Sequence, residues 1–389
     1  MQWGRKWGGR GAAGVVLAGC LVASAAVTAG ASSGSEPSTR LSRALDQLVS
    51  MPGGPPGAIA LVQVGGRTQV TTAGVGNTVT AAPISPGDTV RIASVSKAFS
   101  GAVALALVTK GQMNLDDTIG QRLPYLPRSW RPVTLGQLLH HTSGLADYIK
   151  VPAFLDLLRS DPHVQLSPIQ LLAYVTNQRP LFKPGSRYDY SDSDNIVVGL
   201  MVEAVTHGTY EAALARYVTG PLDLTQTTLP ENADLTEPYV HGYAVEPGTA
   251  PEDISTSLNP GLAWASGGML STAAELNTFM RAYIRGTLTD PDTHHEQFRF
   301  VPGSSGPPGP GTNAAGLAVY RYRTACGTVY GHTGNFPGYT LFSAATSDGS
   351  RSVTVVINEQ LNNNPVTPPF TQLRLAEGLG VCAATGLNP

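Results

Sequence analysis

The sequence is short of charge and of lysine, and this narrows what the chain does. Only 13% of its 389 residues are charged, and the formal net charge is −2. A nucleic-acid or membrane-surface partner needs a concentrated basic face, and nothing in this composition suggests one. We therefore expect no nucleic-acid partner, and the sequence gives no sign of an obligate protein partner.

Long apolar runs are also missing after the first forty residues, so no later segment is expected to span a bilayer. At the start, three basic residues precede an apolar stretch over 11–30, and residues 29–31 read Ala-Gly-Ala, an A-x-A cleavage site. We predict that residues 1–31 are a cleaved secretion signal and that the mature protein is extracellular. The alternatives are a single anchoring helix and a cell-envelope lipoprotein attached through Cys20. Residues after Cys20 stay apolar, which argues against lipidation.

Cysteine is scarce, with three in the chain. No CxxC or mixed Cys/His spacing is present, and the histidine pair 294–295 does not form an HExxH motif, so we interpret that pair as loop residues and expect no metal and no cofactor. Without Cys20, the even pair Cys326 and Cys382 remains, which predicts a disulfide in an oxidising compartment. Two free buried thiols are the alternative.

Predicted strands lie at both ends of the chain, with mostly helical periodicity between them. The strand-like runs are 58–64, 68–73, 318–322, 340–346 and 352–358. This order predicts α/β and all-α parts: one sheet built from the two ends of the chain, with a helical lobe inserted in the middle. We assign about 40–130 and 255–389 to the sheet lobe and about 131–254 to the helical lobe.

Ser94 begins an apolar run, SVSKAFSGAVALALVTK, that predicts a buried helix ending at Gly111. Lys97 follows by three residues, and on a helix this spacing puts the hydroxyl and the amine on one face. A serine hydroxyl is a poor nucleophile until a base takes its proton, and burial at this site would lower the pKa of the lysine, as a base requires. Of five lysines, only Lys97 has a serine three residues before it. The pair predicts a serine nucleophile, against the alternative of a chance Ser-x-x-Lys.

Two further motifs follow in order, Tyr-Ser-Asp at 190–192 and His-Thr-Gly at 332–334. Together the three resemble Ser-x-x-Lys, Tyr-x-Asn and Lys/His-Thr-Gly of the serine β-lactamase and D-alanyl-D-alanine carboxypeptidase superfamily. The likeness is to the branch that holds class C β-lactamases, carboxypeptidases and related esterases, and it covers about residues 40–384. It implies a β-lactamase/transpeptidase-like fold, with an antiparallel sheet flanked by helices.

The resemblance also implies a two-step acyl transfer. Ser94 would attack a carbonyl while Lys97 and Tyr190 share its proton, and His332 would add a hydrogen bond and a part-time charge. The backbone N–H groups of Ser94 and Asn335 would form the oxyanion hole. The residues that the resemblance places at the substrate are Asp192, Trp264, Thr333, Gly334 and Asn335. For Tyr190, His332 and Trp264, a purely structural role is the alternative.

Two positions depart from the superfamily pattern. Asp192 stands where an asparagine is common, and an ionised carboxylate cannot donate to an acyl carbonyl as an amide does. It would instead keep Lys97 protonated and move the base role towards Tyr190. Carboxypeptidase members hold the substrate carboxylate with an arginine on the strand before His-Thr-Gly. Here we expect Tyr320 in that inward register, rather than Arg321 or Arg323.

These features predict a secreted serine hydrolase that works through an acyl-enzyme. The leading activity is that of a D-alanyl-D-alanine carboxypeptidase-like peptidase on peptidoglycan-type peptides. A carboxylesterase or a β-lactamase on the same scaffold is the alternative, and a non-catalytic penicillin-binding or sensor protein is the alternative from another class. The expected partner is a small peptide, β-lactam or ester substrate.

Overall fold

The structure is a computed structural model that describes residues 36–301, 308–361 and 367–388. The predicted secretion signal at 1–31 lies outside the described residues. Within the described ranges, no helix combines the length and the hydropathy needed to cross a membrane.

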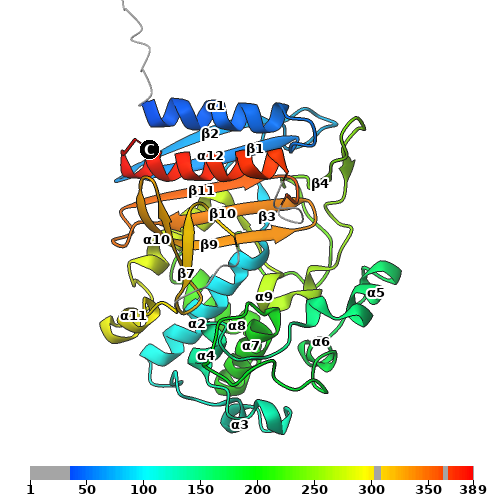
Figure 1. The fold of residues 1–389 in the computed structure, drawn as a ribbon, viewed down its shortest axis with the longest axis vertical. Helices are drawn as coiled ribbons and strands as arrows, with labels where there is room; N and C mark the ends of the chain where they lie inside the picture. Colours follow the sequence, from blue (N-terminus) through cyan, green and yellow to red (C-terminus); the bar gives the residue numbers. More distant parts are fainter. Residues whose placement is uncertain (1–35, 302–307, 362–366, 389) are drawn as a thin grey trace, which may run out of the picture. The chain divides into compact units, whose positions relative to one another are not determined.

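A seven-stranded antiparallel sheet is built from both ends of the chain, as the strand-like runs predict (Figure 1). Its strands are β1 (Gly57–Val64), β2 (Arg67–Gly74), β7 (Thr312–Ala315), β8 (Tyr320–Thr324), β9 (Gly327–Phe336), β10 (Tyr339–Ala345) and β11 (Arg351–Ile357). Their order is β2-β1-β11-β10-β9-β8-β7. The early hairpin therefore joins the late strands through β1 and β11, which pair from Ala58 with Ile357 to Val64 with Arg351.

Successive side chains of a strand point to opposite faces of the sheet, and here both faces are buried. In β1, Ile59 and Leu61 belong to one buried cluster and Ala60 to the other. On the face of Ala60 lie α1 (Glu36–Ser50) and α12 (Pro368–Thr385), side by side (Figure 1). The other face packs against α10 (Ala273–Ile284) and the 3-10 turn Ala93–Val95, so the sheet is a central layer with helices on both sides.

The middle of the chain supplies the other helices on that side of the sheet, several of which pack on α7 or on neighbouring turns rather than on the strands (Figure 1). They are α2 (Ser96–Thr109), α3 (Ile119–Arg122), α4 (Leu135–Leu139), α5 (Pro152–Ser160), α6 (Pro168–Ala173), α7 (Asp192–Thr206), α8 (Tyr210–Leu214), α9 (Trp264–Gly267) and α11 (Pro291–Gln297). Two short ladders join β3 (Thr89–Arg91) to β6 (Leu270–Thr272) and β4 (Tyr243–Ala244) to β5 (Glu252–Asp253).

The histidine pair 294–295, expected in a loop, lies in the helix α11. Asp290 caps this helix by accepting a hydrogen bond from the backbone N–H of Thr293. Pro291 occupies the first turn, where its missing N–H costs nothing. Asp290 and Pro291 are signals for the start of a helix, and the prediction of a loop did not take them into account.

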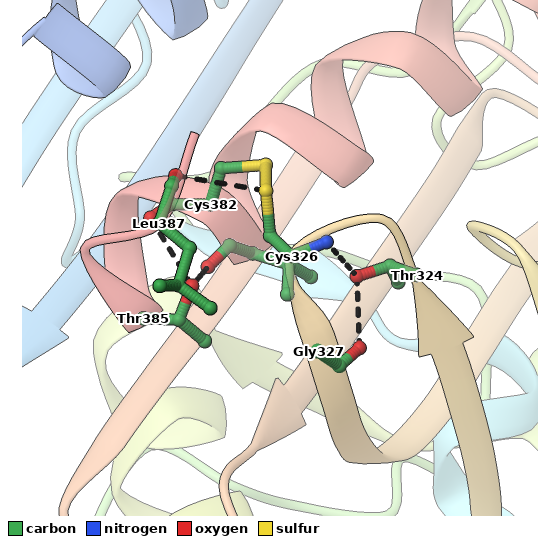
Figure 2. The surroundings of a disulfide bond; sticks show 7 residues. Thr324, Cys326, Gly327, Cys382, Thr385 and Leu387 are labelled. Carbon is green, nitrogen blue, oxygen red and sulfur yellow. Dashed lines mark hydrogen bonds between the residues drawn. A yellow bond between two sulfur atoms is a disulfide. The ribbon is translucent and has the colours of Figure 1, made fainter. Parts of the chain in front are cut away.

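Cys326 and Cys382 form a disulfide in the structure (Figure 2). It joins the turn between β8 and β9 to the last turns of α12. Thr324 Oγ1 accepts a hydrogen bond from the backbone N–H of Cys326 and donates one to the carbonyl oxygen of Gly327, which fixes that turn. The bond therefore fastens α12 to the sheet on the face away from α2.

Candidate active site

Ser94 lies in a 3-10 turn, Ala93–Val95, immediately before α2. Ala93 has φ of +50°, a left-handed conformation that is costly for a residue with a side chain. From Val90 to Leu107, Ser94 is the one residue that is not buried. The turn therefore holds a single hydroxyl open at the end of an otherwise buried helix.

Lys97 lies under that hydroxyl and is almost fully buried, with 1% exposure. Its Nζ is 3.2 Å from Ser94 Oγ, 2.6 Å from Asp192 Oδ1 and 2.7 Å from the carbonyl oxygen of Ser266. The carboxylate and the carbonyl can only accept, so at least two of the lysine hydrogens point to them. The predicted contacts of Lys97 with Ser94 and with Asp192 are therefore present in the structure.

Tyr190 completes this cluster. Nζ of Lys97 lies 4.8 Å from the centroid of its ring. Burial and the charge of Asp192 raise the pKa of Tyr190 well above its ordinary value, and the neighbouring Ser94 side chain opposes that rise. Its buried Oη has no hydrogen-bond partner among the described residues. At neutral pH the side chain is thus a protonated phenol, and it is not a phenolate that could act as a base before the reaction begins.

Two carboxyl groups that the motifs did not mark support this arrangement. Asp147 accepts a hydrogen bond from the backbone N–H of Asp192 at 3.2 Å. Burial, with the charge of Asp192, raises the pKa of Asp147 to about 7. Asp194, in the first turn of α7, lies 2.9 Å from His141 Nδ1, and the ring of His141 packs 4.5 Å from that of Tyr190. The acidic start of α7, Ser-Asp-Ser-Asp, is the signal that could have marked Asp194.

The strand β9 borders the turn of Ser94, as the resemblance implies. A Cβ added to Gly334 would lie 2.4 Å from the carbonyl oxygen of Ile92 and 2.2 Å from Leu341 Cδ1. Real side chains do not fit at such distances, so only glycine lets the strand come this close to the turn. Asn335 follows directly, with its Oδ1 accepting a hydrogen bond from Thr340 Oγ1 at 3.0 Å.

His332 differs from expectation in its charge. It is fully buried, and burial lowers its pKa to about 3, so it is neutral where we expected a part-time charge. Its Nδ1 lies 2.5 Å from the carbonyl oxygen of Thr333. A carbonyl only accepts, so Nδ1 carries the hydrogen and Nε2 is an acceptor. Nε2 has no partner within the described ranges.

A pocket of about 360 Å³ opens at Ser94, and it is lined mainly by apolar side chains. Its lining residues are Ala93, Ser94, Ile149, Phe154, Leu155, Leu158, Asp192, Leu258, Asn259, Leu262, Ala263, Gly267, Asn335, Phe336, Pro337 and Gln360. Asp192 is the one acid or base in this set. Among the described residues, no His, Cys, Asp and Glu side chains gather in threes that could hold a metal ion.

Of the residues expected at the substrate, Asp192 and Asn335 line this pocket, and Trp264, Thr333 and Gly334 do not. Trp264 lines a separate pocket, packs on Tyr210 and donates from Nε1 to Glu211 Oε1 at 3.0 Å. The structure thus shows its packing contacts, and its contact with a substrate stays a prediction. Thr333 is buried within β9 with 4% exposure, so its side chain is not open to a ligand.

Tyr320 occupies the expected register beside His332. Its ring lies 5.0 Å from the histidine ring, edge to face, and its Oη is 2.7 Å from Tyr188 Oη. Arg321 and Arg323 alternate with it along β8. Arg321 packs over Phe300, and Arg323 is exposed. Neither arginine lines the pocket at Ser94.

Comparisons with known proteins identify the family and the fold of the chain. The model of the family described as Beta-lactamase matches residues 43–377. The crystal structure of a D-stereospecific amidohydrolase from a Streptomyces species is similar with a TM-score of 0.75 and 30% sequence identity, covering 83% of this chain and 94% of that one. The D-amino acid amidase of Ochrobactrum anthropi SV3, in complex with L-phenylalanine, is similar in fold, with a TM-score of 0.78, 20% identity and coverage of 90% and 99%.

A curated relative by sequence is penicillin-binding protein 4 of Amycolatopsis lactamdurans. It is 29% identical over 235 residues, which is 59% of each of the two chains. The chain spans between 33% and 62% of the length of the first curated relatives it matches.

Proposed function

The chain belongs to the serine β-lactamase and penicillin-binding-protein family of hydrolases, and from this we propose that it is a secreted serine amidohydrolase acting on short D-configured peptides and amides. The observation that carries the proposal is the open Ser94 hydroxyl with Lys97 Nζ 3.2 Å below it, at the end of a mostly apolar pocket. The reactive side chains of all three motifs are present, which argues against a non-catalytic binding protein.

In the proposed acylation, Ser94 Oγ attacks the substrate carbonyl carbon and the bond to the leaving nitrogen breaks. Tyr190 is a phenol at neutral pH, so it acts as a relay: it takes the serine proton as it passes its own to the leaving amine. Lys97 orients Ser94 Oγ and stabilises the negative charge that develops next to it. The N–H groups of Ser94 and Asn335 hold the carbonyl oxygen.

Deacylation runs the same relay with water. A water molecule gives a proton to Tyr190 and attacks the ester carbonyl carbon, while Tyr190 returns a proton to Ser94 Oγ. The products are a carboxylic acid and the free serine, so no proton is gained or lost by the enzyme. His332 is neutral and adds no charge to the site, since its Nδ1 donates a hydrogen bond to the carbonyl oxygen of Thr333.

The sequence resemblance favours a D-alanyl-D-alanine carboxypeptidase, whose substrate ends in a carboxylate. The pocket favours a neutral leaving group, because Tyr320 takes the position of the carboxylate-binding arginine and none of the described lining residues is cationic. The D-stereospecific relative at 30% identity supports D-configured amides, with carboxylesterase and β-lactamase activities as side reactions of the same centre. We propose that the protein acts without a nucleic-acid partner and without an obligate protein partner.

Secretion is part of this proposal. It rests on the leader-like residues 1–31 and on the Cys326–Cys382 disulfide, which is typical of proteins from oxidising compartments.

The test is purified mature protein assayed against a D-amino acid amide, its L-enantiomer, a D-alanyl-D-alanine peptide, a chromogenic cephalosporin and a short-chain nitrophenyl ester. We expect the D-amide and the ester to be cleaved, and the L-amide to be a poor substrate. Cleavage restricted to the cephalosporin would make the protein a β-lactamase instead, and no turnover of any substrate would favour a binding protein.

A further inference from the structure

We infer that Asp192 is a binding site for the free α-ammonium group of the substrate, so that the enzyme selects unblocked D-aminoacyl compounds over N-acylated ones. The inference rests on the proposed function and names the substrate class of the same site. Superfamily members usually carry an asparagine at this position, which donates to an acyl carbonyl. A carboxylate can only accept hydrogen bonds, so at this position it favours a hydrogen-bond donor on the substrate.

The carboxylate has room for a second cation. Lys97 occupies Oδ1, at 2.6 Å. No other side chain in the described ranges hydrogen-bonds to Oδ2, although a carboxylate offers about four acceptor sites on its two oxygens. Asp192 lines the pocket, and its remaining 6% exposure opens there. An incoming ammonium would share the carboxylate with Lys97 without displacing it.

The distances suit an amino acid. Ser94 Oγ and Asp192 Oδ1 both contact Lys97 Nζ, at 3.2 Å and 2.6 Å, so they lie within about 6 Å of each other. In an aminoacyl group the carbonyl carbon and the α-nitrogen are separated by only about 2.5 Å, since two bonds of about 1.5 Å join them at an angle near 111°. With the carbonyl carbon about 3 Å from Oγ, the α-nitrogen reaches hydrogen-bond distance of the carboxylate.

The charges around the pocket favour an ammonium there. Among the described residues Asp192 is the one ionisable side chain that lines it, and the other lining residues cannot replace a charged partner. Both neighbouring histidines are neutral, because burial lowers the pKa of His141 and of His332 to about 3. Lys97 is already paired. A blocked, neutral amide nitrogen would leave the free side of the Asp192 carboxylate without a donor of full charge.

The experiment compares D-phenylalanine p-nitroanilide with its N-acetyl form, which shares the side chain and the leaving group. We expect kcat/KM to favour the free amine by about tenfold to a hundredfold, the range of a charge-assisted hydrogen bond. The preference should decline as the pH rises through the pKa of the substrate amine, about 7.7–8.0 for an ordinary α-amino group. Equal rates for both substrates, or a preference that ignores this titration, would overturn the inference and leave the proposed function standing.

Asp192→Asn restores the usual residue of the superfamily. Because it also changes the partner of Lys97, its effect is read from the ratio of the two substrates, in which a general loss of activity cancels. The ratio should fall to one or invert towards the N-acetyl substrate, and an unchanged ratio would contradict the role. Asp189→Asn removes a carboxylate from the same segment that does not line the pocket, and it should keep the wild-type ratio.

Two outcomes separate the proposals. If Asp192→Asn does not fold, the pH dependence of the wild-type ratio decides the inference. If the wild-type enzyme cleaves neither substrate, the proposed function fails, and this inference fails with it.

Discussion

The sheet face under α1 and α12 and the face that carries Ser94 are buried by different kinds of side chain. Under α12 the contacts are mostly apolar, and the buried Glu377 pairs with the partly buried Arg374 one helix turn before it. Around Ser94, buried ionisable groups come from several segments, among them Lys97, Asp192 and His332.

The difference indicates why each face carries the side chains it does. Apolar contacts under α12 follow the period-two pattern of the strands, and they stabilise the fold directly. Buried charges are costly unless they are paired, and replacing such pairs by apolar groups is often neutral or stabilising. The charged cluster at Ser94 is therefore best explained by a role in the reaction rather than in stability. The following predictions test whether one face serves stability and the other activity.

The largest effect is expected for Ser94→Ala. Removing the nucleophile should lower kcat/KM for the best substrate by roughly 10⁴–10⁶-fold, while thermal unfolding stays close to wild type because the hydroxyl is partly exposed. A fluorophosphonate should add one adduct mass to the wild-type protein and none to the variant. Labelling that persists in Ser94→Ala would move the nucleophile elsewhere.

Tyr190→Phe should come second. Losing the phenol removes the proton relay, and the acylation rate should drop by about 10²–10⁴-fold. The ring stays, so its contacts with Lys97 and His141 and the stability of the fold should persist. Single-turnover acylation, measured with an ester and an amide, is the readout. An undiminished rate would mean that Lys97 alone carries the proton.

On the opposite face, replacing Cys326 and Cys382 together by serine should affect stability rather than activity. The disulfide closes a loop with a sequence separation of 56 residues, and its removal should cost about 2–4 kcal/mol of unfolding free energy, mainly through the unfolded state. We expect kcat/KM to change less than about twofold, since α12 packs away from Ser94. Mass spectrometry should find no free thiols in the secreted wild-type protein. Two free thiols would refute the bond.

Glu377, on α12, and the two buried histidines near Ser94 should respond to pH with opposite signs. Asp147 near Ser94, whose pKa burial also raises to about 7, should respond as Glu377 does. Burial raises the pKa of Glu377 to about 7 from an ordinary 4.5, so its share of stability is present below pH 4.5 and is lost as the pH rises through 7. Burial lowers the pKa of His141 and His332 to about 3 from 6.5, so their share is present above pH 6.5 and is lost as the pH falls towards 3.

Glu377→Gln should therefore reduce the loss of stability between pH 4.5 and 7 by an amount on the order of 2 kcal/mol, and the share of Asp147 in that window should remain. The acid-side loss below pH 6.5 should remain, because both histidines are kept. Denaturant unfolding at a series of pH values measures both. A variant whose pH profile matches the wild type would show that Glu377 does not titrate in this range.

Much of the apolar framework could be predicted because its signals are local. The hairpin of β1 and β2, the buried helix after Ser94 and the antiparallel sheet from both chain ends are confirmed. The strand-like runs do not include β9, whose glycines are poor strand formers. Gly334 is there because the backbone at Ile92 lies against it, and that contact is invisible along the sequence.

The site was predictable only where a motif marked it. Lys97 and Asp192 meet Ser94 as expected, although their roles in catalysis stay predictions. Asp147 reaches the cluster from a segment without a motif, and Asp194 lies two residues after the second motif. The importance of both follows from burial and contacts. Trp264 shows the reverse case: a residue beside a marked stretch whose side chain turns towards Tyr210.

The smallest effect is expected at the carboxylate end of the substrate. With Tyr320 beside His332, and with no cation among the lining residues that the structure describes, a free terminal carboxylate finds no charged partner in that set. A D-alanyl-D-alanine peptide and its C-terminal amide should then be cleaved with kcat/KM values within about tenfold of each other, because the charge-assisted hydrogen bond that separates them elsewhere, about 1.5–3 kcal/mol, is missing. A preference for the free acid of about a hundredfold or more would reveal a working carboxylate site, through Arg321 or Arg323, and the two ends of the pocket would then both recognise charge.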